Sequence, residues 1–110
     1  MKNNQSPEIS HEMICSIVSL ATTGVNGVER ISLRITDEIM DKLPLTSPLK
    51  GVKISHNPEG LMISVYLITE PGVDMVRVSK EVQAKIKASV ESMTGLQVAS
   101  VNVRIEGSGI

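Results

Sequence analysis

Side chains that could carry out chemistry are few in this sequence of 110 residues. There is one thiol, Cys15, so the chain cannot form an intrachain disulfide. A nucleophile needs a base beside it and a third group that holds the base. Cys15 would act as a redox or nucleophilic thiol if its pKa were lowered, and no neighbouring pattern indicates this. We interpret Cys15 as an incidental small residue on the flank or outer side of a helix.

The two histidines, His11 and His56, are the next candidates. Either could hold a metal ion together with carboxylates from distant parts of the chain. Metal-binding spacings such as H-E-x-x-H and C-x-x-C are absent from the sequence. We therefore interpret both imidazoles as solvated surface groups.

Acidic pairs could act as general acid and base where a pocket separates their pKa values. The pairs here are Asp37 with Glu38 and Glu81 with Glu91, all on predicted surfaces. The glycines at residues 24–27 follow a helix and precede a strand, whereas phosphate-binding loops run from a strand into a helix. We predict no catalytic, cofactor-binding or metal-binding residue and no cofactor, so the chain is expected not to be an enzyme.

Composition narrows the classes of partner. The net charge is −1, and Lys and Arg are scattered among Asp and Glu without a basic block. Tyr66 is the single aromatic residue, so platforms for stacking bases or sugars are lacking. We expect no nucleic-acid partner. No apolar run approaches the length that spans a bilayer, so we expect no direct membrane insertion, and the lone cysteine favours the cytoplasm.

Hydrophobic periodicity predicts two main helices. The first covers residues 10–23, begins at the N-cap Ser10 and ends at Gly24. The second covers residues 74–93 and ends at Gly95, which suits a left-handed cap, and Leu96. We interpret their apolar stripes as core, the alternative for the second being a partner-binding face. The stripe residues are Met13, Ile14, Ile17, Val18, Leu20 and Ala21, and then Met75, Val78, Val82, Ile86, Val90 and Met93.

Alternation of apolar and polar residues predicts the strands. Residues 28–35 form one strand with Ser32 on the wet face, and residues 51–68 form a hairpin around the turn 57–60. In the last strand, 97–105, Ala99 and every second residue after it face inward. Ile9 is expected to close a short first strand, and residues 37–43 one or two helical turns. The irregular connection that follows is set by Pro44 and Pro48.

The order of elements predicts an α+β fold, a small two-layer sandwich with a mostly antiparallel sheet and both main helices on one face. The helix before the last strand would make a right-handed crossover if the strands that it joins are parallel. We predict one domain over residues 8–106, a disordered N-terminal tail over 1–7 and a C-terminal tail over 107–110.

The helix that ends in Glu91-Ser92-Met93-Thr94-Gly95-Leu96 and the strand that contains Val101-Asn102-Val103 form a specific pattern. By this pattern the chain resembles the alkaline shock protein family, which comprises envelope-stress proteins of Gram-positive bacteria. The resemblance spans roughly residues 8–106, and its specific part is a helix ending in Glu-x-Met-Thr-Gly-Leu followed by a strand ending in Val-Asn-Val. The segment 36–49 lacks the basic cluster often seen in the family. The matching stretches are Ile9-Ser10, Gly24 to Val28, Lys50 to Lys53, Lys80 to Gln83, Val90 to Leu96, Val98 and Val101 to Val103.

The resemblance implies a non-enzymatic protein of the envelope stress response that acts as an interaction or scaffold module. It implies protein partners, among them a membrane-anchoring protein, and self-association. The location would then be cytoplasmic, or at the membrane through that partner. Three alternatives stay open: an accessory subunit of a lipid-metabolism enzyme, a small nucleic-acid-binding module, and a hydrolase with His11, His56 or Cys15 in a pocket where its pKa is perturbed.

Overall fold

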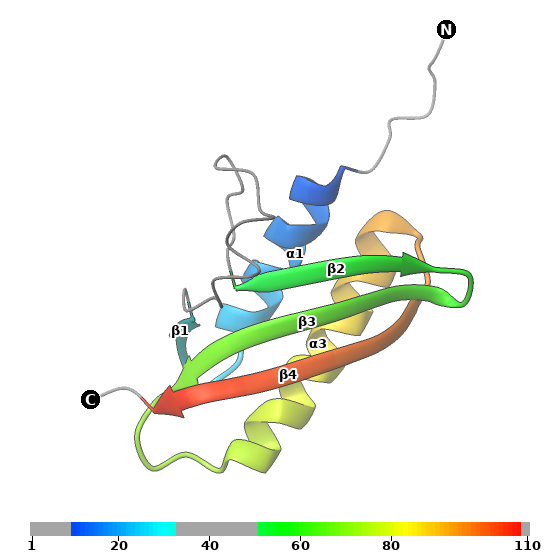
Figure 1. Ribbon diagram of the computed structural model, residues 1–110. Helices are drawn as coiled ribbons and strands as arrows, with labels where there is room; N and C mark the ends of the chain where they lie inside the picture. The colour runs from blue at the N-terminus through cyan, green and yellow to red at the C-terminus, as the bar shows by residue number, and fades with distance from the viewer. Residues whose placement is uncertain (1–9, 33–50, 109–110) are drawn as a thin grey trace, which may run out of the picture.

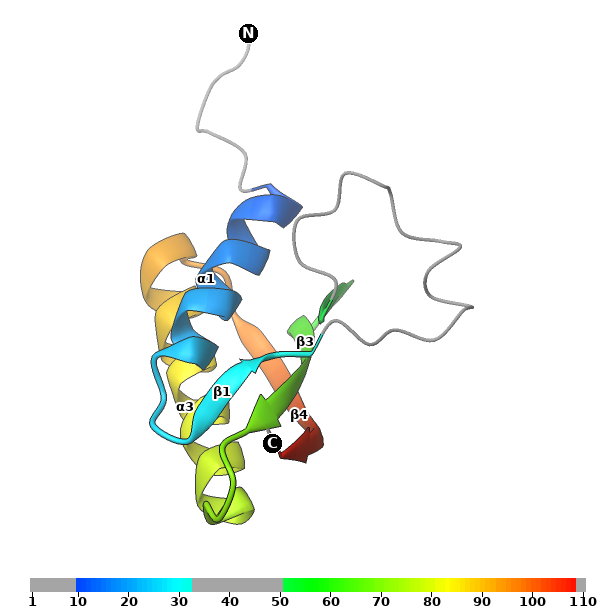
Figure 2. The ribbon, with the colours of Figure 1, turned by 90° about the vertical axis from the view of Figure 1, so that its left-hand side faces the viewer.

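The computed structural model describes residues 10–32 and 51–108. Two helices lie on one face of a four-stranded sheet, and Figure 2 shows the two layers from the side. The predicted α+β sandwich is therefore confirmed. The predictions for the tail 1–7, for Ile9 and for residues 33–50, including the helical turns at 37–43, lie outside the described residues. The elements are α1 (His11–Thr23), β1 (Val28–Ile31), β2 (Val52–Asn57), β3 (Gly60–Thr69), α3 (Met75–Thr94) and β4 (Val98–Ser108).

The sheet is built around β3. On one edge, β2 pairs with residues 60–65 and β1 with residues 67–69, both antiparallel. On the other edge, β4 runs parallel to β3, and α3 connects the two strands across the sheet (Figure 1). A parallel pair requires such a crossover because the chain must return to the starting end of the sheet. The crossover that the sequence suggested is thus present.

Both helices begin and end within one residue of the predicted bounds. The Ser10 hydroxyl accepts a hydrogen bond from the Met13 N–H at 3.0 Å and caps α1. Asp74 caps α3 in the same way, accepting from the N–H groups of Val76 and Arg77. Gly95 ends α3 in the left-handed conformation, with φ 76°. These local bonds satisfy backbone groups that a helix end leaves without partners.

The interior is aliphatic. The core side chains of α3 are Val78, Val82, Ile86 and Val90, all with no exposed surface. They share one buried cluster with the helix-facing side chains of β3, which are Leu61, Ile63, Val65 and Leu67. Val101, Val103 and Ile105 of β4 are partly buried against the same cluster.

Four residues of the predicted helical stripes are not core. Met13 and Leu20 of α1 are 47% and 73% exposed, and Met75 and Met93 of α3 are 45% and 69% exposed. The two α3 methionines occupy the last turn at each end of a 20-residue helix, which is about 30 Å long. The apolar pattern of α3 therefore extends further than the surface that covers it. In α1, the buried face is instead turned away from Met13 and Leu20 and towards Thr22. All four predictions are wrong.

Two predictions in the strands are wrong. The β3–β4 register shifts between Leu61 and Met62, so Val98 rather than Ala99 aligns with buried Leu61, and Ala99 is exposed. A bulge adds one residue to one strand and reverses the faces that simple alternation assigns. Ser32, predicted on the wet face, is buried at 4% exposure, and it lies one residue past the end of β1. β4 also continues to Ser108, beyond the predicted end at residue 105.

Candidate interaction surface

The candidate reactive residues do not form a common site. Cys15 is buried at 1% exposure, which corrects its predicted place on the flank or outer side of the helix. Cys15 and Thr22 are buried on one side of the predicted stripe, whereas Met13 and Leu20 are exposed on its other side, so the buried face of α1 is turned relative to that stripe. Burial raises the pKa of the Cys15 thiol above its usual value, and the negative charge of Glu12 adds to this. A buried thiol with a raised pKa is a poor nucleophile.

The two histidines are exposed, His11 at the start of α1 and His56 near the end of β2. Within residues 10–32 and 51–108, no three of the His, Cys, Asp and Glu side chains lie close enough to hold a metal ion. Glu81 and Glu91 have separate partners: Glu81 accepts from Arg77 at 3.0 Å, and Glu91 from the Val98 N–H at 2.9 Å. Asp37 and Glu38 lie outside the described residues.

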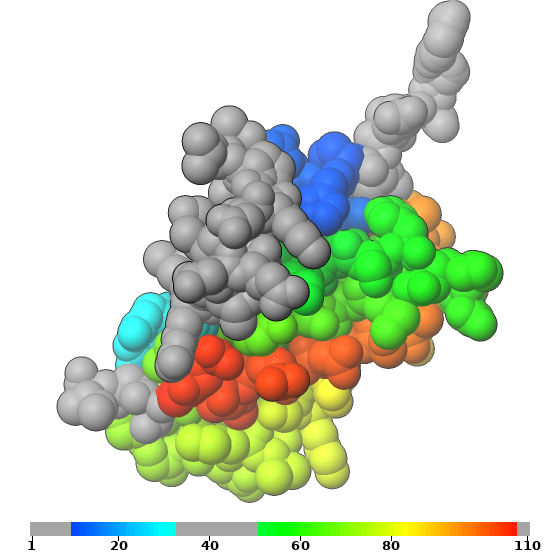
Figure 3. Space-filling model, in the orientation of Figure 1, coloured from blue at the N-terminus to red at the C-terminus, as the bar shows by residue number. Residues whose placement is uncertain are grey.

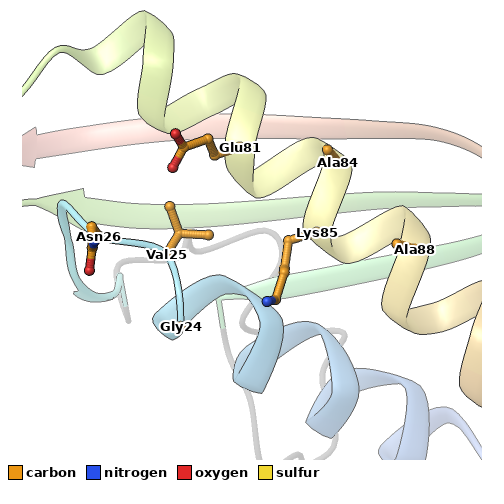
Figure 4. A pocket seen from close by; sticks show the side chains of 7 residues that line it. All are labelled: Gly24, Val25, Asn26, Glu81, Ala84, Lys85 and Ala88. Atoms are coloured by element: carbon orange, nitrogen blue, oxygen red, sulfur yellow. The ribbon is translucent and has the colours of Figure 1, made fainter.

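A shallow groove lies between the C-terminal end of α1 and the outer side of α3 (Figure 4). Its volume is about 490 Å³. Arg77 of α3 donates to the Asn26 carbonyl at 3.4 Å and to Glu81 at 3.0 Å, so its side chain links the two sides of the groove. No Ser, Thr, Cys or His lines it, so the groove brings no hydroxyl or thiol nucleophile and no histidine base to a substrate. The lining residues are Gly24, Val25, Asn26, Glu81, Ala84, Lys85 and Ala88.

The outer edge of β4 offers the longest strand for binding. In a strand, the N–H and C=O of each residue point to one edge, and successive residues alternate between the two edges. The N–H of Leu61, a helix-facing residue, donates to the Gln97 carbonyl at 2.8 Å, so the helix-facing residues of β3 bond towards β4. In a parallel ladder, the N–H and C=O of a residue bond to the two residues that flank its aligned residue on the other strand. Ile63 and Val65 of β3 align with Val101 and Val103 of β4. The backbone groups that bond to β3 are therefore those of Ser100, Asn102 and Arg104.

It follows that Val101, Val103 and Ile105 direct their backbone groups away from β3. Gln83 of α3 donates from Nε2 to the Val101 carbonyl at 3.1 Å, which fits this orientation. The backbone groups of Val103 and Ile105 meet no strand in the described part of the chain. Figure 3 shows β4, in orange and red, at the surface beside α3. An unpaired row of this kind is a template for another strand.

The face of α3 beside this edge carries Val76, Lys80, Gln83 and Lys87. Their spacing of four, three and four residues puts them on one side of the helix. Val76 is an apolar side chain with 65% of its surface exposed. We define the β4 edge surface as these four residues of α3 together with Val101, Val103 and Ile105 of β4. The sequence pattern did not reveal the β4 edge surface, because the pairing of the strands determines which edge stays open.

No helix in the described ranges is both long enough and apolar enough to cross a membrane.

Comparison with solved structures gives the fold alone. A variant of MamM-CTD superimposes with a TM-score of 0.53 at 13% sequence identity. The match covers 89% of this chain and 98% of that one. At this identity the likeness carries no information about binding or activity.

Comparison with known sequences identifies the family. The chain is 30% identical over 101 residues to uncharacterized protein Spy1614 of Streptococcus pyogenes serotype M6, covering 90% of this chain and 84% of that protein. It is 29% identical over 100 residues to uncharacterized protein YqhY of Bacillus subtilis (strain 168), covering 91% and 74%. The profile of the alkaline shock protein 23 family, described as having a cell envelope-related function, matches residues 1–109. The chain therefore belongs to the alkaline shock protein 23 family, as the helix and strand at its C-terminal end indicate.

Proposed function

We propose that this chain is a non-enzymatic interaction module of the cell envelope, and that it binds a protein partner through the β4 edge surface. The observation that carries the proposal is the outward row of backbone groups at Val103 and Ile105, which no described strand covers. Addition of a strand to an exposed edge is a common mode of peptide recognition, because main-chain hydrogen bonds supply affinity without a deep pocket.

The surroundings of the edge support the same proposal. Val76 is exposed beside it, and an added strand would remove part of this apolar surface from water. Family membership supports the envelope as the place of action, since the family function is described as cell envelope-related. A membrane-anchoring protein is one class of partner that would use such an edge.

Site-specific photocrosslinking in the source cells tests this function. A photoreactive residue in place of Val76 should give adducts with an envelope protein, because Val76 lies beside the β4 edge. The matched control is Leu20 of α1, which is 73% exposed but lies on a helix that contacts β1 and β2 rather than β4. Equal adducts from both positions, or adducts from Leu20 alone, would contradict the proposed binding surface.

A further inference from the structure

The positive charges around the β4 edge surface indicate the charge of the strand that it binds. Lys80 and Lys87 lie on the face of α3 that also carries Gln83, and all three side chains are exposed. Arg104 is exposed on β4 and faces the other side of the sheet, because it aligns with Tyr66. Within the described ranges, no ion pair is formed by Lys80, Lys87 or Arg104.

Distances along the two elements place Lys80 beside the open part of β4. Two hydrogen bonds fix the alignment, from the Val98 N–H to Glu91 and from Gln83 to the Val101 carbonyl. Between them the helix advances about 12 Å over eight residues, and the strand about 7 Å, because the bulge at Ala99 makes three residues of β4 span two of β3. Counted from Gln83, which bonds to Val101, Lys80 lies about 5 Å along the helix and level with residues 102–103, and Val76 lies about 11 Å along it and level with residues 104–105. Lys87 lies about 6 Å in the other direction, level with residues 99–100.

From this arrangement we infer that the β4 edge surface binds an extended acidic segment of a partner protein. The inference rests on the proposed function and names the chemistry of its partner. A strand added to β4 alternates its side chains between the two faces of the sheet. Acidic side chains on the helix side meet Lys80 and Lys87, and an acidic side chain on the other side lies across from Arg104. Opposite charges across neighbouring strands stabilise the pair, whereas like charges destabilise it.

A second copy of this chain fits the same edge less well. Two β4 strands paired antiparallel about Val103 would bring the two α3 helices side by side. Each Lys80 would then face the Lys80 of the other copy, since this residue lies level with the centre of the pair. Self-pairing would consequently be opposed by like charge and favoured by salt, whereas binding of an acidic strand would be weakened by salt. Salt dependence separates the two occupants.

The test uses the full chain and a fluorescein-labelled peptide of about six residues in which Glu and Val alternate, a length that matches the open part of β4. We expect the peptide to bind at low salt and to dissociate as salt increases. A peptide of alternating Lys and Val should not bind. The Glu–Val peptide with every second backbone nitrogen methylated should also fail, because it lacks the N–H groups that pair with β4.

Charge-reversal variants locate the binding. The double variant Lys80→Glu, Lys87→Glu should weaken binding by about tenfold or more at low salt. The matched control is Lys85→Glu, an exposed lysine of the same helix on the side of the α1 groove, which should leave binding within about twofold. Thermal unfolding of each variant checks that the fold is retained.

Three results would overturn the inference: no binding of the Glu–Val peptide, equal binding of the Lys–Val peptide, or equal losses in the double variant and the Lys85→Glu control. Self-association that strengthens with salt, seen by sedimentation, would assign the edge to a second copy instead. A failure of this inference can be distinguished from a failure of the proposed function. If Val76 crosslinks an envelope partner but the charge variants change nothing, the edge binds a partner that is not acidic.

Discussion

Replacing Ile86 by Ala should lower the free energy of unfolding by about 2–5 kcal/mol. Ile86 has no exposed surface and belongs to the single cluster that joins both helices to β3 and β4. The loss combines the transfer free energy of the removed methyl and methylene groups with the cost of the cavity they leave. Few rearrangements can fill that cavity, because the adjacent core residues of α3, Val82 and Val90, are β-branched and have little rotamer freedom. Urea unfolding at equilibrium measures the change.

Met93→Ala is the matched control for this substitution. Met93 lies on the same helix at the predicted core spacing but is 69% exposed. Its truncation should change the free energy of unfolding by less than about 0.5 kcal/mol, as expected for surface positions. A loss below about 1 kcal/mol for Ile86→Ala would instead mean that water already reaches the interior between α3 and the sheet.

Replacing Gly60 by Ala should destabilise the chain by about 2–4 kcal/mol. Gly60 has φ 134°, which is unfavourable for a residue with a side chain. A Cβ at this position would lie 2.7 Å from the Gln97 carbonyl oxygen and 3.0 Å from the Ala99 nitrogen. These are backbone atoms, so β4 itself must shift, and the hydrogen bond from the Leu61 N–H to Gln97 would be strained or lost.

Gly72→Ala separates the cost of the backbone conformation from the cost of the close approach to β4. Gly72 has φ 80°, also in the left-handed region, but a Cβ there would meet no atom within 4 Å. The backbone conformation alone should therefore cost about 1 kcal/mol. Urea unfolding of both variants should rank Gly60→Ala well above Gly72→Ala. Equal losses would show that β3 and β4 do not approach each other closely at the start of their pairing.

The sequence predicted the helices and the hairpin well because their signals are local. Caps at Ser10 and Gly95 depend on hydrogen bonds within a few residues, and the period of the apolar residues identifies the centre of each stripe. The same period could not show where the covering sheet ends. Met75 and Met93 continue the pattern of α3 past that limit and are exposed.

The errors in the strands have a nonlocal cause. Alternation assigns Ala99 to the core, but a bulge opposite Leu61 gives that place to Val98. A bulge is decided by pairing with a distant strand, so no local pattern in residues 97–105 reveals it. Cys15 was misplaced because the elements that cover a helix determine which of its sides is buried, and this side is turned towards Cys15 and away from Leu20. The β4 edge surface was missed for the same reason, since the strand order determines which backbone groups remain open.

Amide hydrogen exchange along β4, followed by NMR under native conditions, tests the central claim most directly. If the outer edge of β4 is open, the N–H groups of Val103 and Ile105 should exchange rapidly, whereas those of Asn102 and Arg104, which bond to β3, should be protected. Saturation with a partner that adds a strand should then protect Val103 and Ile105 as well. Uniform protection of all four amides in the chain alone would contradict the account, because it would mean that the edge is already covered.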